Sequence, residues 1–369
     1  MEGLEYKLIR KSELAEFLQS PLFREAPVLP ITRHRAASYL NNPRSSGDDV
    51  LLFLALWEGR IHAYLGIFPD RIHFGEEAHR AGWLSCMYVD PVLRGKGVAK
   101  TFMKLAFEYW EDAILVTNFT PAAWGLYQKT ERFQDLHRGS GIRAYLKVNL
   151  SEIVPRKTGK AWTKTPLQIS DGLANLILKP IHLKARNRLT KTNLELETDR
   201  VLSDEDREFI TRNSRQDFER RGADDIQWML DYSWVKQGEP DEEASRYHFT
   251  SHSPAFRNQL LRIRRSGKLI GLVHFTLREG LLKLPHLWFN REDVQWILDG
   301  ISRFMFEENA HTLSTFDPDL VRLMQTGNHP FLHLREPRRH LIISRKFVAQ
   351  MQTAPPEYLP DGAADGTFT

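Results

Sequence analysis

Along the first 150 residues, apolar runs typical of strands alternate with segments whose apolar residues recur at helical spacing. Alternating or continuous apolar runs predict strands at 4–10, 50–57, 61–68, 83–89, 113–118, 133–136 and 142–150. Apolar residues at three- and four-residue spacing predict helices at 12–18, 32–39, 98–111 and from Pro121 onward. The predicted order is β, α, α, β, β, β, α, β, α, β, β, with the last two strands closing a single sheet.

The second half of the chain repeats this plan. Strands are predicted at 194–201, 260–265, 269–277, 281–289, 311–316, 332–334 and 340–347, and helices at 204–212, 224–235, 294–309 and 318–325. The turn at 266–268 corresponds to the turn at 58–60, each lying between two apolar strands. We infer an internal repeat, with domains at 1–150 and 193–350 and a flexible tail at 351–369.

A basic segment, residues 151–192, joins the two predicted domains. This segment contains nine Lys and Arg residues and two acidic residues, so its net charge is +7, whereas the net charge of the whole chain is +4. Apolar residues at helical spacing predict a short helix that Pro180 interrupts. Such a helix either packs between the domains or touches an anionic membrane surface. The break at Pro180 favours packing.

Composition narrows the class of protein. A single cysteine, Cys86, excludes an intrachain disulfide and a cysteine-rich metal site, so we expect no metal. No apolar run reaches the roughly 18 residues of a membrane span, and the N-terminus lacks the apolar core of a signal peptide. Because the positive charge is concentrated in one segment, we expect no nucleic-acid partner. We expect a cytoplasmic monomer or homodimer.

The stretch 89–99 carries the clearest chemical signal. A strand, a glycine-containing turn and an amphipathic helix together offer main-chain N–H groups and a helix N-terminus to a phosphate. Gly95 and Gly97 let a ligand approach the backbone, and Arg94 and Lys96 add positive charge. The patterns GxxxxGK[ST] and GxGxxG are absent. The alternative is a turn whose glycines serve helix–strand packing alone.

Arg94, Gly97 and Ala99 fit the pattern [QR]xxGx[GA], which resembles motif A of the GNAT N-acetyltransferases. A later stretch, 118–129, is similar to the N…A…LYxKxGF motif of that family, except that Glu131-Arg132-Phe133 stands where the family has Gly-Phe. The resemblance implies an α/β (α+β) fold with two tandem GNAT-like domains. Each would hold a mixed, mostly antiparallel twisted sheet flanked by helices, and two central strands of the sheet would splay apart.

The resemblance also implies acetyl-CoA as co-substrate. By resemblance, the residues that hold it are Met87, Val89, Arg94, Gly95, Lys96, Gly97, Val98, Ala99 and Asn118. Tyr127 is either the acid that protonates the departing thiolate or a half-buried helix tyrosine. The strand 83–89 has no glutamate base, so we expect Ser85 to hold a water there. The carboxylates and imidazole just before this strand are further candidates for the base, namely Glu76, Glu77 and His79.

The predicted C-terminal domain differs from the N-terminal one at the positions that correspond to the phosphate loop and to Tyr127. Residues 290–293 contain no glycine, and Glu292 and Asp293 would repel a pyrophosphate. Met324 stands at the position of Tyr127. We therefore expect an acetyl-CoA-dependent N-acyltransferase acting on a primary amine of a small-molecule or peptide acceptor. Its C-terminal domain would be non-catalytic and would shape the acceptor site. The alternative is a non-catalytic acyl-CoA-binding or scaffold protein.

Overall fold

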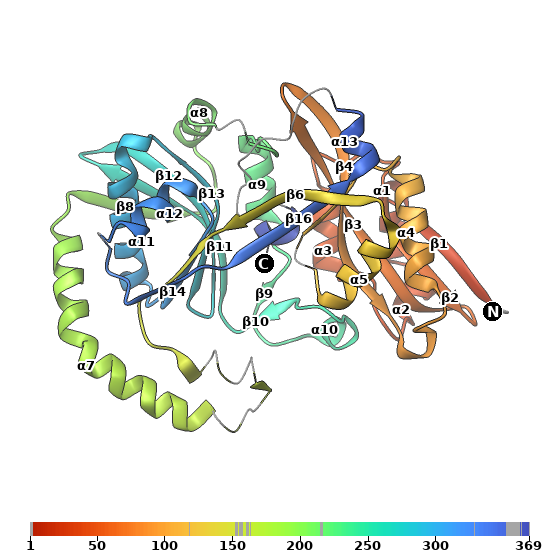
Figure 1. Ribbon diagram of the computed structural model, residues 1–369, viewed down its shortest axis with the longest axis horizontal. Helices are drawn as coiled ribbons and strands as arrows, with labels where there is room; N and C mark the ends of the chain where they lie inside the picture. Colours follow the sequence, from red (N-terminus) through yellow and green to blue (C-terminus); the bar gives the residue numbers. More distant parts are fainter. Residues whose placement is uncertain are drawn as a thin grey trace. The chain divides into compact units, whose positions relative to one another are not determined.

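Two seven-stranded sheets, both mixed and mostly antiparallel, are flanked by helices (Figure 1). This confirms the predicted fold class. The structure, a computed structural model, describes residues 3–117, 119–151, 154, 158–159, 162, 164–214, 217–327, 329–351, 362 and 364–368. Among these residues, no helix combines the length and the mean hydropathy that crossing a membrane requires.

The first sheet has the strand order β1-β2-β3-β4-β5-β16-β6. Its strands are β1 (Leu4–Arg10), β2 (Val50–Trp57), β3 (Arg60–Phe74), β4 (Glu77–Val89), β5 (Ile114–Thr117), β6 (Phe133–Ser140) and β16 (Arg338–Ser344). The helices of this unit are α1 (Lys11–Phe17), α2 (Pro21–Arg24), α3 (Arg33–Leu40), α4 (Val98–Tyr109), α5 (Pro121–Thr130), α8 (Asp204–Arg212), α9 (Ala223–Asp231), α10 (Glu242–Arg246) and α13 (Arg345–Ala349). A small parallel pair is formed by β9 (Lys236–Gln237) and β10 (His252–Ser253).

The second sheet has the strand order β15-β7-β14-β13-β12-β11-β8. Its strands are β7 (Ile142–Tyr145), β8 (Leu194–Asp199), β11 (Phe256–Arg265), β12 (Lys268–Arg278), β13 (Leu281–Phe289), β14 (Thr312–Thr315) and β15 (His333–Arg335). Its helices are α7 (Lys164–Thr190), α11 (Val294–Glu307) and α12 (Pro318–Gln325). The succession β11-β12-β13-α11-β14-α12 parallels β2-β3-β4-α4-β5-α5, as the predicted repeat requires.

Two strands do not lie in the sheet that the sequence predicted. β7 pairs with β14 and not with β6, and β16 pairs with β5 of the first sheet. The predictions that 142–150 closes the first sheet and 340–347 the second are therefore wrong. Only Gly141 separates β6 from β7, too few residues for a hairpin turn. A Cβ at Gly141 would lie 2.6 Å from the carbonyl oxygen of Thr315, so glycine permits the close approach to β14.

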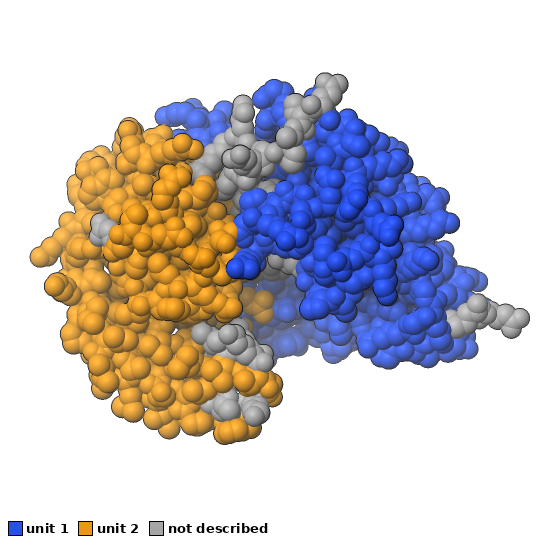
Figure 2. Space-filling view, in the orientation of Figure 1, with its two compact units in different colours: residues 1–139, 200–258, 338–369 blue, residues 140–199, 259–337 orange. Residues whose placement is uncertain are grey.

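Each compact unit gathers segments that are distant in the sequence (Figure 2). Unit 1 comprises residues 1–139, 200–258 and 338–369, and unit 2 comprises 140–199 and 259–337. The predicted division at 150 and 193 follows the repeat of elements, not these units, and it stays a prediction.

The core of unit 1 forms where α4 lies against β2 to β5. Phe102, Met103, Ala106 and Phe107 on one face of α4 are buried in this cluster. Phe368 is also fully buried, with its ring stacked on Trp234 at a centroid distance of 4.5 Å. The prediction of a flexible tail is wrong at this residue, because its aromatic ring finds apolar partners in the 200–258 segment.

The helix of the basic segment is longer than the sequence predicted. α7 runs for 27 residues with Pro180 inside it, so the predictions that the helix is short and that Pro180 interrupts it are wrong. Polar side chains on the preceding turns anchor the helix within unit 2. Asn175 exchanges two hydrogen bonds with the main chain of Val148, and Asp171 accepts from the amides of Leu150 and Ser151. These bonds help to hold α7 despite the donor that Pro180 lacks.

Candidate functional site

β4 and β5 pair over only part of their length. Their parallel register ends at Leu84 with Val116, whereas β4 continues to Val89. The residues of β4 are buried from Ala81 to Leu84 and half-buried from Ser85 to Val89. The five residues after Leu84 therefore lie beyond the ladder with β5. Met87 and Val89 pack partly against the core of unit 1, so it is their main chain that can serve a ligand.

The loop after β4 is held at both ends by buried side chains. Leu93 and Val98 lie in the core, while Gly95 and Gly97 between them are exposed. The two glycines have φ values of 77° and 81°, in the left-handed region that other residues rarely adopt. A Cβ added to either glycine would meet no atom within 4 Å. Helix–strand packing therefore does not require these glycines, and the space above them is open to a ligand.

The N-terminus of α4 has no side-chain cap. Gly97 occupies the N-cap position, and the first helical bond runs from the Thr101 amide to the Gly97 carbonyl at 3.0 Å. The amides of Val98, Ala99 and Lys100 in the first turn consequently have no partner inside the helix. By contrast, the Asp317 side chain caps α12 through two amides. An uncapped N-terminus next to open space is suited to bind an anion.

Two basic side chains border this N-terminus. Arg94 is exposed, and its Nε donates to the carbonyl of Val89 at 3.1 Å, which ties the loop back to the end of β4. Lys96 is also exposed, and its Nζ lies 5.8 Å from the ring centroid of Trp57. Both residues add positive charge at the position where the helix dipole is positive.

Tyr127 on α5 is buried between two aromatic rings. Its ring meets Phe119 edge-on at 5.8 Å and Phe133 at 5.5 Å. Burial raises the pKa of Tyr127 to about 12, so the hydroxyl stays protonated at neutral pH. The helix ends at Glu131, which has a φ of 55°. Glu131 thus provides a left-handed residue in this turn, where the sequence has no glycine.

Ser85 belongs to a polar cluster around a buried arginine. Arg35 on α3 donates through Nη2 to Ser85 Oγ at 2.7 Å and to the Tyr39 hydroxyl at 3.0 Å. Through Nη1 it donates to Cys86 Sγ at 2.9 Å and to the Tyr247 hydroxyl at 2.7 Å. The guanidinium thus orients the side chains of β4 at the point where the ladder with β5 ends.

Arg35 and Tyr247 were not predicted from the sequence. Neither belongs to a motif, and the two residues are 212 positions apart in the chain. Their meeting depends on the 200–258 segment joining unit 1, which no local pattern indicates.

Comparison with protein families gives a match over the residues that build this site. Residues 13–131 match the sequence profile described as the acetyltransferase (GNAT) family. The chain contains a GNAT domain. Transfer of acyl groups from acyl-CoA is the general chemistry of this family, and the loop, α4 and α5 all lie within the matched range. Comparison with curated proteins gives no match.

Solved structures with a similar course of the chain include several acyltransferases. A probable N-acyltransferase from Enterococcus faecalis V583 is 11% identical, with a TM-score of 0.49 over 92% of this chain and 73% of its own. N-myristoyltransferase from Saccharomyces cerevisiae, solved with bound myristoyl-CoA, is 11% identical, with a TM-score of 0.49 over 98% and 83%. A GCN5-related N-acetyltransferase from Sphaerobacter thermophilus is 10% identical, with a TM-score of 0.42 over 93% and 95%. All three scores are below 0.5, so the conclusions below rest on the family match and on the geometry of the chain.

Three candidates for the base do not lie at the loop of the GNAT domain. Glu76 and Glu77 are found where β4 begins, and a rise of about 3.3 Å per residue places them roughly 40 Å from Val89. Glu76 pairs with Arg220 at 3.0 Å, and Glu77 pairs with His79 at 3.5 Å. The prediction that all three residues lie just before the strand is wrong, because β4 begins six residues earlier than predicted, and we do not assign the base to them. Asn118 lies outside the described residues.

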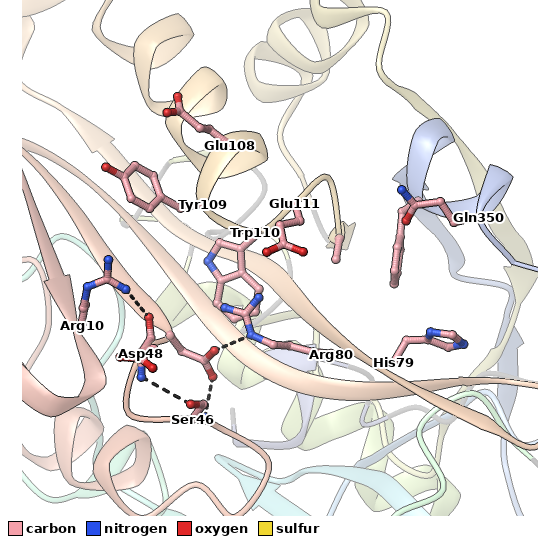
Figure 3. A pocket seen from close by; sticks show the side chains of 13 residues that line it. Arg10, Ser46, Asp48, His79, Arg80, Glu108, Tyr109, Trp110, Glu111 and Gln350 are labelled. Atoms are coloured by element: carbon pink, nitrogen blue, oxygen red, sulfur yellow. Dashed lines mark hydrogen bonds and ion pairs between the residues drawn. The ribbon is translucent and has the colours of Figure 1, made fainter.

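A surface pocket of about 630 Å³ occupies the opposite end of α4 from the loop (Figure 3). Glu108 and Glu111 line it, together with Arg80, whose guanidinium binds Asp49 at 2.5 Å. A helix C-terminus with two glutamates repels phosphates. We therefore do not place the acyl-CoA site of the GNAT domain in this pocket.

The second sheet does not repeat the loop of the GNAT domain. Residues 291–293 form a short 3₁₀ helix, and Asp293 is the N-cap of α11 with a φ of −91°. No described residue from Asn290 to Val294 has a positive φ. Met324, at the position that corresponds to Tyr127, is fully buried. Unit 2 thus retains the elements of the repeat without the left-handed glycine turn.

Proposed function

We propose that this protein is an acetyl-CoA-dependent N-acyltransferase that acts on a primary amine of a small-molecule or peptide acceptor. The observation that carries the proposal is the uncapped N-terminus of α4 behind Gly95 and Gly97. This N-terminus follows β4, whose last residues no longer pair with the parallel strand β5, and it lies in the range that matches the GNAT family. We further propose that the C-terminal half is non-catalytic and shapes the acceptor site, since the corresponding turn carries Glu292 and Asp293.

The chain offers a consistent set of contacts for the co-substrate. The amides at the start of α4 and the basic groups of Arg94 and Lys96 would hold the pyrophosphate. The main chain of β4 beyond Leu84 would face the pantetheine arm and the thioester. The proposed co-substrate residues are Met87, Val89, Arg94, Gly95, Lys96, Gly97, Val98, Ala99 and Asn118.

Two side chains are proposed for proton transfer. The amine attacks the thioester carbonyl carbon, the carbon–sulfur bond breaks, and the thiolate takes a proton from the Tyr127 hydroxyl. A pKa of about 12 keeps that hydroxyl protonated until it is needed. Ser85, oriented by Arg35, would hold the water that receives the proton of the amine.

A thiol-release assay tests this proposal. The full-length protein is incubated with acetyl-CoA and a panel of amines, and free CoA thiol is measured against a control without amine. We expect thiol release that depends on at least one amine and yields the acetylated amine in equal amount. Tight binding of acetyl-CoA without release for any small-molecule or peptide amine would favour the non-catalytic alternative.

A further inference from the structure

α7 carries apolar side chains on two opposite faces. The inner face packs within unit 2, where Leu189 is fully buried and α7 contacts α11. Asp171 on this face is also buried, because it accepts the main-chain bonds from Leu150 and Ser151. The inner face therefore accounts for the attachment of the helix, and the outer face is not needed for it.

The outer face of α7 is apolar and exposed. It spans most of a helix that runs along the edge of unit 2 (Figure 1). The exposed fractions are 64% for Ile169, 60% for Leu173, 63% for Leu176, 77% for Ile177, 56% for Ile181 and 45% for Leu183. Intervals of three and four residues place most of these side chains in one stripe. A continuous exposed apolar stripe indicates a surface that binds something.

The charges around the stripe are almost all positive. The helix contains Lys164, Lys179, Lys184, Arg186 and Arg188, and its one acid, Asp171, is turned inward. Trp162, just before the helix, is 74% exposed. Exposed Leu and Ile, flanking Lys and Arg and an aromatic residue at one end are the composition of helices that lie in a membrane interface.

We propose that α7 binds flat on the surface of an anionic lipid bilayer. The apolar stripe would enter the boundary between headgroups and acyl chains, and Lys179, Lys184 and Arg186 would meet anionic headgroups. Charge complementarity selects this occupant. A second copy of the chain would bring two basic helices together, whereas an anionic headgroup layer neutralises them.

Flotation of the full-length protein with vesicles tests the proposal. We expect binding to phosphatidylcholine vesicles that contain phosphatidylglycerol, weak binding to pure phosphatidylcholine, and a loss of binding as salt rises. The double variant Leu173→Gln/Ile177→Gln should lose binding, while Val201→Gln, a change at a 62% exposed apolar residue outside α7, should not. Lys179→Glu/Lys184→Glu should weaken binding by about tenfold or more, and the exposed control Lys268→Glu should leave it unchanged.

Circular dichroism checks that each variant is folded, which we expect because the changed side chains are exposed. Equal binding to neutral and anionic vesicles, or no binding to either, would overturn the proposal. Light scattering gives a further outcome against it. If the wild type is a dimer that Leu173→Gln/Ile177→Gln separates, and no vesicle binding is seen, the stripe is a self-association surface.

Discussion

Tyr127 combines a buried ring with a hydroxyl group of raised pKa. The ring is held by Phe119 and Phe133, so its position does not depend on the hydroxyl. Removal of the hydroxyl oxygen alone, as in Tyr127→Phe, therefore distinguishes a role in packing from a role as an acid.

Tyr127→Phe should lower kcat by about 10²-fold, the low end for general-acid assistance, because a thiolate already leaves readily. The dissociation constant for CoA should stay within a factor of two or so, since the hydroxyl acts in the transition state. Steady-state kinetics and calorimetry measure the two quantities. Tyr109→Phe, a change at a partly exposed tyrosine on α4, is the matched control. An unchanged kcat would leave Tyr127 with a packing role alone.

The raised pKa of Tyr127 has a consequence for pH. An acid must be protonated to act, and burial moves the ionisation of this hydroxyl from about 10 to about 12. The kcat of the wild type should therefore show no loss from tyrosine ionisation between pH 8 and 10, roughly, measured with a saturating acceptor. A fall in kcat with an apparent pKa near 10 that Tyr127→Phe abolishes would contradict the buried environment.

At the scale of elements, the hydrophobic pattern located most strands and helices because their periodicity is local. It found β2, β12 and β13 to within one residue at each end, whereas β3 extends to Phe74, beyond its predicted end at Phe68. It did not assign β7 and β16 to their sheets, since the partner of a strand is not written in the strand itself. The loop before α4 could be predicted from its glycines, because they lie close to one another in the sequence. The Arg35 cluster could not, because it depends on contacts between distant segments.

The central strands of the second sheet bury a titratable pair. His274 on β12 is stacked on His286 of β13, with ring centroids 5.5 Å apart. Burial lowers the pKa of His274 to about 3. Because the pKa is lower in the folded state, the neutral ring contributes stability above pH 6.5 that is lost progressively as the pH falls toward 3.

The wild-type protein should therefore lose up to about 1.4 kcal/mol of unfolding free energy per pH unit below 6.5 from this histidine. His274→Gln removes the titration, so its stability should fall less steeply between pH 7 and roughly pH 4. Urea unfolding at several pH values gives the two slopes. His333→Gln, at an exposed histidine of the same sheet, should keep the wild-type slope. Parallel slopes for His274→Gln and the wild type would show that His274 is not buried as described.

At the scale of the molecule, unit 1 depends on segments from across the chain. Asp70 lies buried between Arg44 at 3.1 Å and Arg221 at 2.6 Å, and Arg44 also binds Asp225 at 2.7 Å. The pairs Asp70–Arg221 and Arg44–Asp225 join the first 139 residues to the 200–258 segment. Removing one partner of a buried ion pair leaves an uncompensated charge, which lowers the free energy of unfolding by about 3–5 kcal/mol.

A fragment of residues 1–150 should therefore fail to fold. It lacks β16, which covers the edge of β5, and the arginine and aromatic partners of the 200–258 segment. We expect no cooperative thermal transition in calorimetry and no CoA binding, although the motifs and the match at 13–131 all lie within the fragment. The full chain is the control. A fragment that unfolds cooperatively and binds CoA like the full chain would show that the other segments are dispensable.

The uncapped start of α4 is proposed as the single CoA site of the chain. Titration calorimetry of the full-length protein with CoA should give one site per chain. Gly97→Glu should weaken binding about hundredfold or more, because it adds a carboxylate where the phosphates would lie. Gly267→Glu is the matched control. Gly267 lies in a turn of the second sheet, has a φ of 76° and has open space around it, so glutamate there imposes a similar backbone strain. This variant should bind CoA like the wild type. Two equal sites per chain, or undiminished binding by Gly97→Glu, would show that the start of α4 is not the single CoA site.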